Sequence, residues 1–220
     1  MIPYYELINR YDKAPGIRIV DTFSGKLIQS DWWRYTSLNG TTSGGMSDEI
    51  DGGYELTSTT TGQTSEQIAT FRVGGPSQVF NALGSTFICS MKSATVNNAL
   101  SVMGSRCGFK RDANDTFNVG NFAGVLKNTG NVNYRAYTAS NSGSGTNSTE
   151  TSIYQDTNWH VWKGELNGTS YNLSGDGVQQ TTSTTKLPVL NMMPFLYQYG
   201  YQPSAGSSTT SFNYNEAWNH

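Results

Sequence analysis

The sequence predicts an all-β protein built of short antiparallel strands, and two observations carry this prediction. The first is the Asn167-Gly168 pair between strand-like runs at residues 159–166 and 169–173. Such a pair is a strong hairpin signal, because both central residues of a type I′ turn take positive φ. The second is the punctuation of the whole chain by Gly, Ser, Thr and Asn between runs of β-branched and aromatic residues. No repeat with a period of about 20 to 50 residues is present, which argues against propellers and solenoids.

Residues 1–16 differ from the rest of the chain and predict an N-terminal arm, leaving residues 17–220 as one β-sandwich domain. Pro3 can open a short helix that Pro15-Gly16 ends. The candidate anchors of this arm on a neighbouring subunit are Tyr4, Tyr5, Leu7 and Ile8. Strand-like runs then occur at residues 17–23, 54–59, 67–73, 85–92, 99–104, 116–122, 131–138, 159–166, 187–197 and 211–218.

Two of these runs, 85–92 and 99–104, are separated by a short polar segment and predict a hairpin. Alternation along the first run places Phe87, Cys89 and Met91 on one face, which we expect to be buried. Whether Cys89 and Cys107 form a disulfide or remain two buried thiols is left open, because sequence separation does not fix the distance between their Cα atoms.

The last run, 211–218, alternates so that Phe212, Tyr214 and Trp218 share a face, as in a sheet with one buried and one wet side. By contrast, residues 39–53 and 139–151 are dense in Gly, Ser, Thr and Asn. They have too little apolar content to pack, and we expect exposed loops there.

The composition excludes some classes of function. Charged residues make up 14% of the chain and the net charge is −2, whereas a nucleic-acid binder needs clustered Lys and Arg for phosphate contacts. No apolar run approaches the roughly 18 residues of a membrane-spanning helix, and the N-terminus lacks the pattern of a signal peptide. A surface made soluble by uncharged hydrogen-bonding groups is typical of extracellular and virion proteins, so we expect one of these locations.

Several segments together resemble the concanavalin A-like lectin and glucanase superfamily, which includes laminin-G-like domains. They are Asp21-Thr22-Phe23-Ser24-Gly25 with Trp32-Trp33, Asp51-Gly52-Gly53-Tyr54, Trp159-His160-Val161-Trp162, Asp176-Gly177-Val178, Leu187-Pro188 and Met193-Pro194-Phe195. The resemblance covers residues 17–218 and implies a jelly roll of two curved antiparallel sheets, with the first and last strands together. Members include lectins, glycoside hydrolases, adhesion modules and domains of virus particles, and the fold does not choose among them.

The catalytic pattern of the resembled glucanases is Glu-x-Asp-x-Glu on a central strand, where alternation sets three carboxylates on one face. A retaining pair of carboxylates must stand about 5 to 5.5 Å apart. In Asp48-Glu49-Ile50-Asp51, Glu49 and Asp51 match the first two positions, but Gly53 occupies the third and the segment precedes an early strand. We therefore expect no catalytic residue, and a glycoside hydrolase is our third hypothesis.

The two histidines, His160 and His220, show no metallohydrolase spacing, and no Gly-x-Ser-x-Gly elbow accompanies them. A Ser-His-Asp triad built on His160 stays open, although a histidine beside Trp159 and Trp162 is predicted to be packed. The resemblance suggests calcium, for which the candidate ligands are Asp112, Asn114 and Asp115, or alternatively Asp48, Glu49 and Asp51. Because they complete no calcium loop and such residues are ordinary turn formers, we predict no cofactor.

Sugar binding usually requires exposed aromatic rings together with amides and carboxylates. Tyr197, Tyr199 and Tyr201 alternate along one run and would share one strand face. The alternative, which we favour, is a buried or interface stripe, since tyrosine is also enriched at protein interfaces.

The sequence thus predicts a non-enzymatic structural or surface protein of an extracellular assembly, most simply a component of a virus particle. Its partners would be copies of itself or other virion proteins. A carbohydrate-binding or receptor-binding module is the second hypothesis.

Overall fold

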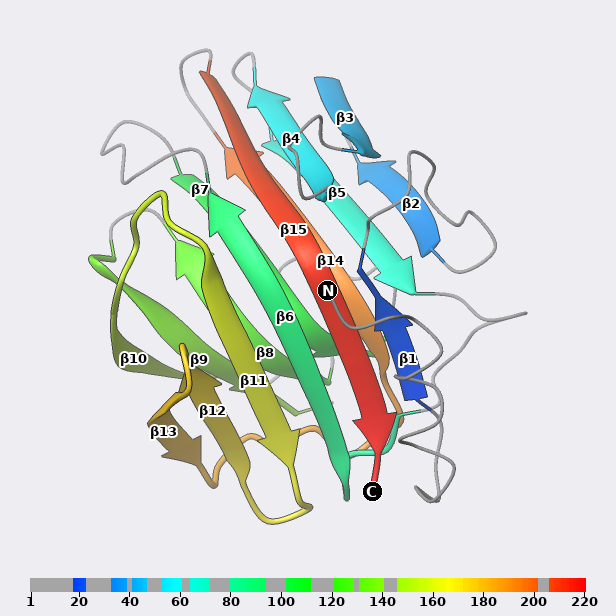
Figure 1. Ribbon diagram of the computed structural model, residues 1–220, viewed down its shortest axis with the longest axis vertical. Helices are drawn as coiled ribbons and strands as arrows, with labels where there is room; N and C mark the ends of the chain where they lie inside the picture. Colours follow the sequence, from blue (N-terminus) through cyan, green and yellow to red (C-terminus); the bar gives the residue numbers. More distant parts are fainter. Residues whose placement is uncertain are drawn as a thin grey trace.

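A computed structural model (Figure 1) describes residues 18–22, 33–38, 41–46, 53–60, 64–71, 80–93, 102–111, 121–128, 131–140, 146–201 and 206–220. Within these residues the chain forms two antiparallel sheets that pack face to face. The predicted arm, with Tyr4, Tyr5, Leu7 and Ile8, lies outside the described residues. No helix among the described residues is long and apolar enough to cross a membrane.

Sheet A has the strand order β13-β12-β11-β6-β15-β4-β3, with β1 also paired to β15. Its strands are β1 (Arg18–Asp21), β3 (Thr41–Met46), β4 (Tyr54–Thr60), β6 (Ser85–Ser93), β11 (His160–Leu166), β12 (Tyr171–Gly175), β13 (Val178–Ser183) and β15 (Gly206–Asn219). Sheet B has the order β10-β9-β8-β7-β14-β5-β2. Its strands are β2 (Trp33–Leu38), β5 (Thr64–Phe71), β7 (Val102–Lys110), β8 (Phe122–Asn128), β9 (Asn133–Ala139), β10 (Thr146–Tyr154) and β14 (Met193–Tyr201).

The predicted jelly-roll sandwich is confirmed, including the meeting of its first and last strands. Strand β1 pairs with β15 in the register Arg18 to Trp218. Strands β6 and β15 cross the middle of sheet A in front of β7 and β14 of sheet B (Figure 1). The protein core lies between these central strands.

Alternation along β6 points Phe87, Cys89 and Met91 into this core, where they are buried as predicted. They meet the inward face of β7, and the rings of Phe87 and Phe109 pack edge to face with centroids 5.5 Å apart. The predicted hairpin between residues 85–92 and 99–104 is wrong, because β6 and β7 belong to different sheets. Which sheet a strand joins is a tertiary property that the local pattern does not specify.

The two tight turns of the β11–β12–β13 meander differ from the prediction. In the first, Gly168 has φ of 84° while Asn167 has negative φ, and the Asn167 N–H donates to the Ser170 carbonyl. The central residues are thus Gly168 and Thr169, and the turn is of the Gly-X, type II′ kind instead of type I′. The type I′ pattern occurs one hairpin later, where Asp176 and Gly177 have φ of 51° and 80°.

Both segments predicted as loops contain strands. β3 lies within residues 39–53, and β10 begins within residues 139–151. Each is the edge strand of a sheet, paired on one side only with β4 or β9. Pairing uses backbone N–H and C=O groups, so an edge strand needs few apolar side chains, and Thr favours the extended backbone.

The predicted alternation in β15 is also wrong, because its pairing with β6 shifts by one residue between Phe212 and Tyr214. This β-bulge leaves one residue unopposed and exchanges the two faces of the strand. Phe212 therefore shares the core with Ala217, while Trp218 is only half-buried.

Candidate functional site

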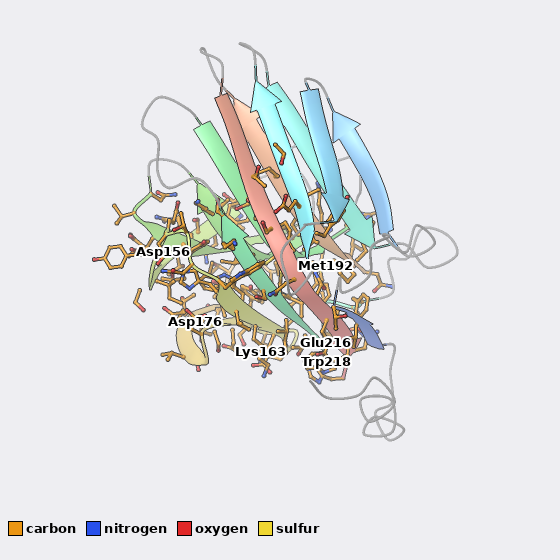
Figure 2. The ribbon with its side chains drawn as sticks, turned by 45° about the horizontal axis from the view of Figure 1, so that its top comes forward. Asp156, Lys163, Asp176, Met192, Glu216 and Trp218 are labelled. Carbon is orange, nitrogen blue, oxygen red and sulfur yellow. The ribbon has the colours of Figure 1, made fainter. Side chains whose placement is uncertain are left out.

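Two carboxylates and a histidine form a connected cluster where the edges of the two sheets approach each other. The ring of His160 contacts Asp176 through Nδ1 (2.7 Å to Oδ2) and Asp156 through Nε2 (2.9 Å to Oδ1). We call this set of three side chains the carboxylate bridge. Figure 2 shows Asp156 and Asp176 side by side at one edge of the molecule, away from Glu216 and Trp218.

Local structure places each member of the bridge. Asp176 sits in the type I′ turn between β12 and β13, and its Oδ1 accepts a hydrogen bond from the Val161 N–H at 2.9 Å. Asp156 lies just after β10, in a turn where its Oδ1 accepts from the Asn158 N–H and its Oδ2 from the Asn158 side-chain amide. His160 opens β11. The bridge therefore ties the end of an edge strand of sheet B to two strands of sheet A.

Beneath the bridge lies a packed aromatic floor. Tyr134 and Trp162 are fully buried, with ring centroids 4.9 Å apart. The His160 ring stands 5.4 Å from that of Tyr134 and 6.2 Å from that of Trp162. The prediction that His160 is packed is thus confirmed, and Trp162 is one of the residues it packs against. Trp159 is half-buried instead, with the Lys92 ammonium 5.1 Å from its ring centre.

The charges of the bridge are mutually supporting. A carboxylate can only accept a hydrogen bond, so both His160 contacts are favourable together when the ring is an imidazolium that donates from both nitrogens. Burial alone would raise the pKa of Asp156, but hydrogen bonds from the Asn158 backbone, His160 and the Asn158 side chain outweigh it and lower that pKa. An Asp156 with a lowered pKa remains ionised and is a poor proton donor.

A buried lysine lies near the bridge, on the inward face of β8. Burial lowers the pKa of Lys127 to about 8. The negative charge of Asp156 opposes part of this lowering. The pKa of Tyr134 is raised by burial and by the nearby charges of Asp156, Cys107 and Asp176. These shifts follow from the low polarity of the interior, which disfavours both an ammonium and a phenolate.

The bridge is partly open to solvent and has apolar neighbours. The side chains of Asp156 and Asp176 are 39% and 44% exposed. Tyr154, 67% exposed, ends β10 two residues before Asp156. The end of β10 also packs at the turn of Asp176, since a Cβ on Gly175 would fall 2.4 Å from Cδ1 of Ile153. Three further exposed apolar side chains border the same region: Val132, Val161 and Val178.

This geometry can hold a ligand but does not resemble a hydrolytic centre. Both ring nitrogens of His160 are occupied by carboxylates, so neither can take a proton from a serine, and the triad hypothesis fails here. The imidazole also fills the space between Asp156 and Asp176, where a sugar bond and a water would have to sit in a glycosidase. Among the residues that the structure describes, no group of three or more His, Cys, Asp and Glu could hold a metal ion.

A second polar cluster lies on the outward face of sheet B. The guanidinium of Arg106, on β7, stands over the rings of Tyr137 (4.8 Å), Phe122 (5.7 Å) and Tyr197 (5.8 Å). We call these four residues the arginine box. Arg106 is 5% exposed and the three rings are equally buried. No Asp or Glu occurs along β7, the central strand of this sheet.

The structure describes only some of the site residues that the sequence predicted. Tyr197 belongs to the arginine box and is buried, while Tyr199 and Tyr201 lie on the same strand with side chains that the structure does not describe. Candidate calcium ligands Asp112, Asn114 and Asp115 also lie outside the described residues, as does the acidic segment 48–51. Sequence reasoning missed Asp156 and Asp176 as partners of His160, although Asp176-Gly177 is itself a type I′ turn signal.

The fold and these clusters define the chain as a jelly-roll sandwich with an acidic surface site at one edge. No protein-family model matches the sequence, and no curated protein matches it. Its structure is similar to a β-glucanase of Bacillus licheniformis (TM-score 0.62, 13% identity, covering 94% of this chain and 100% of that one). It is also similar to a β-1,3-glucanase from Mycobacterium marinum (TM-score 0.59, 12% identity, 94% and 100% covered).

A third similar structure is the binding domain of botulinum neurotoxin DC in complex with rat synaptotagmin II (TM-score 0.60, 9% identity). The match covers 91% of this chain and 47% of that one. The chain therefore has the concanavalin A-like fold that the sequence predicted, a fold that glycoside hydrolases share with binding domains.

Proposed function

We propose that this protein is a non-catalytic recognition module that binds carbohydrate at the carboxylate bridge. The observation that carries the proposal is the pairing of two part-exposed carboxylates, fixed by one buried imidazole, with the exposed ring of Tyr154. Carboxylates accept hydrogen bonds from sugar hydroxyls, and a tyrosine ring offers an apolar face with a polar tip. Because His160 and Asn158 already orient the acids, little side-chain freedom is lost on binding.

Two features support a binding role over catalysis. Strand β7 carries Gly104, Arg106 and Gly108 at its outward positions, where the glucanase pattern would place carboxylates on a central strand. At the bridge itself, the lowered pKa of Asp156 suits a hydrogen-bond acceptor and does not suit a general acid. The similarity to β-glucanases and to a toxin binding domain agrees with a carbohydrate or receptor ligand.

The test is a glycan array, followed by titration of the strongest ligand against the wild type and Tyr154→Ala. Loss of one stacking ring should weaken binding roughly tenfold. Because Tyr154 is 67% exposed, the variant should fold normally. Val189→Ala is the matched control, since Val189 is equally exposed and lies in the segment between β13 and β14; its affinity should equal that of the wild type.

Unchanged affinity in Tyr154→Ala would remove the site from this region. Release of reducing sugar from β-glucans by the wild type, abolished in Asp156→Asn, would overturn the non-catalytic assignment.

The second candidate function is a structural or surface role in a virus particle, favoured by the low charge of the chain and by its Ser-, Thr- and Asn-rich exterior. Here the arm of residues 1–15 would dock on a neighbouring subunit through Tyr4, Tyr5, Leu7 and Ile8. Electron microscopy of the purified protein should then show ordered assemblies, and deletion of residues 1–15 should leave a folded monomer. Normal assembly of the truncated protein would refute the docking role.

A further inference from the structure

The inward faces of β6 and β7 pack against each other across the core. Phe87 packs against Phe109 with ring centroids 5.5 Å apart. Two residues further along β6 and two residues back along β7 stand Cys89 and Cys107. Met91 lies two residues beyond Cys89 on β6, and its Sδ is 3.7 Å from the Cys107 Sγ. Cys89 and Cys107 therefore face each other from opposite sheets, with a packed pair on one side and a sulfur contact on the other.

Both thiols are fully buried and reduced in this structure. Both thiols belong to the same core cluster between the sheets. Burial raises the pKa of Cys107, and the Cys89 thiol raises it further. Since the chain has only two cysteines, they have one intramolecular pairing available.

We propose that Cys89 and Cys107 form a disulfide between the two sheets when the protein folds in an oxidising environment. The bond would join β6, which is paired with β11 and β15, to β7, which is paired with β8 and β14. A disulfide between sheets is a known stabilising element of antibody sandwich domains. Disulfides persist in extracellular settings and are rare in the cytosol.

The oxidant in this reaction is a small-molecule disulfide such as oxidised glutathione. One cysteine thiolate attacks it, forming a mixed disulfide and releasing one glutathione thiolate. The second cysteine thiolate then attacks the protein sulfur of that mixed disulfide and releases the second glutathione. Two protein thiols lose their protons and two electrons, and one oxidised glutathione becomes two reduced molecules.

Burial determines when this exchange can occur. The reactive species is the thiolate, which the apolar core suppresses, and the core also excludes glutathione. The folded, reduced protein should resist oxidation, whereas a chain that refolds in the presence of oxidised glutathione should close the bond as the two sheets come together.

The experiment compares the full chain refolded from urea with and without oxidised glutathione. Refolding with the oxidant should remove both titratable thiols and lower the intact mass by about two mass units, without an added glutathione. Trypsin cuts after Lys92 and Arg106, so the two cysteines fall in different peptides that the disulfide would hold together. Folded reduced protein, given the same oxidant, should keep both thiols for much longer.

The double variant Cys89→Ala/Cys107→Ala provides the stability control. Oxidised wild type should unfold at a higher urea concentration than reduced wild type, while the double variant should unfold at the same concentration in both buffers. A refolded wild type that keeps both thiols, carries glutathione or forms only disulfide-linked dimers would overturn the proposal.

Discussion

The arginine box and the carboxylate bridge contain similar side chains but differ in their exposure to solvent. In each, a nitrogen-bearing side chain is held among aromatic rings: Arg106 over three ring faces, and the His160 ring against Tyr134 and Trp162. The box is closed, with Arg106 only 5% exposed, while the acids of the bridge are 39% and 44% exposed. A closed cluster contributes mainly to stability, and an open one keeps polar atoms available to a ligand.

The largest expected effect comes from breaking the box. Arg106→Met should destabilise the protein by roughly 2–4 kcal/mol, because it removes a buried charge from the rings and other groups that surround it. Urea unfolding measures this loss. Lys163→Met is the control: the Lys163 side chain is 41% exposed and pairs with Glu165 at 2.7 Å, so its loss should cost less than about 1 kcal/mol. Equal effects of the two variants would contradict a structural role for the box.

A second variant separates the two kinds of buried cation. Lys127 has a pKa lowered from 10.5 to about 8, so its ammonium destabilises the folded state wherever both folded and unfolded chains are protonated. The contribution of Lys127 to stability should therefore rise as the pH increases from about 8 to 10.5, and the difference between the wild-type and Lys127→Met profiles measures it. Lys127→Met should lack this rise and be more stable at pH 7 by roughly 1–3 kcal/mol. A less stable Lys127→Met would mean that attraction to Asp156 outweighs burial.

The bridge itself can be broken at its centre. His160→Gln carries both of its amide N–H donors on one nitrogen, so it cannot reach the two carboxylates from opposite sides as the imidazole does. It should lower the free energy of unfolding by roughly 1–2 kcal/mol. Amide exchange should increase at Asp176, whose N–H donates to the Val161 carbonyl, and at Val161, whose N–H donates to Oδ1 of Asp176 beside the bridge. A variant as stable as the wild type would show that the two short contacts contribute no net stability.

The smallest expected effect is on protein stability at acid pH, to which the ionised Asp156 contributes. Because the pKa of Asp156 is lowered from 3.8, its ionised form stabilises the fold above that value, and this contribution is lost as the pH falls through the folded-state pKa. Asp156→Asn should flatten the acid limb of the stability profile by less than about 1 kcal/mol, since the side chain is more than a third exposed. Superimposable pH profiles for the two proteins would exclude this contribution.

Strands with strong apolar alternation could be predicted from the sequence. Those at Phe87–Met91 and Trp162–Leu166 were located correctly, because side-chain burial alone determines which face turns inward. The strands β3 and β10 could not be predicted, since their pairing depends on the backbone of a neighbouring strand. The faces of β15 were reversed by a bulge, which leaves no clear mark in the local pattern.

For the candidate site, the sequence indicated a packed His160 but not its partners. Asp156 precedes it by four residues on an irregular turn, and Asp176 follows sixteen residues later across a whole hairpin. Their meeting depends on the turn at Asp176-Gly177 and on the approach of β10 to Gly175. Both are tertiary facts, although the turn could have been recognised from its two residues.

Strand β15 has a consequence for the order of folding. It supplies the pairing partner for β4, β6 and β1, so sheet A stays divided into separate pieces until this strand has left the ribosome. Arg18 cannot pair with Trp218 until that residue has been synthesised, and contacts between residues so far apart in the sequence form slowly. During synthesis the apolar edges of β6 and β4 are exposed together, which makes this interval the time of greatest risk of aggregation and of greatest need for chaperones.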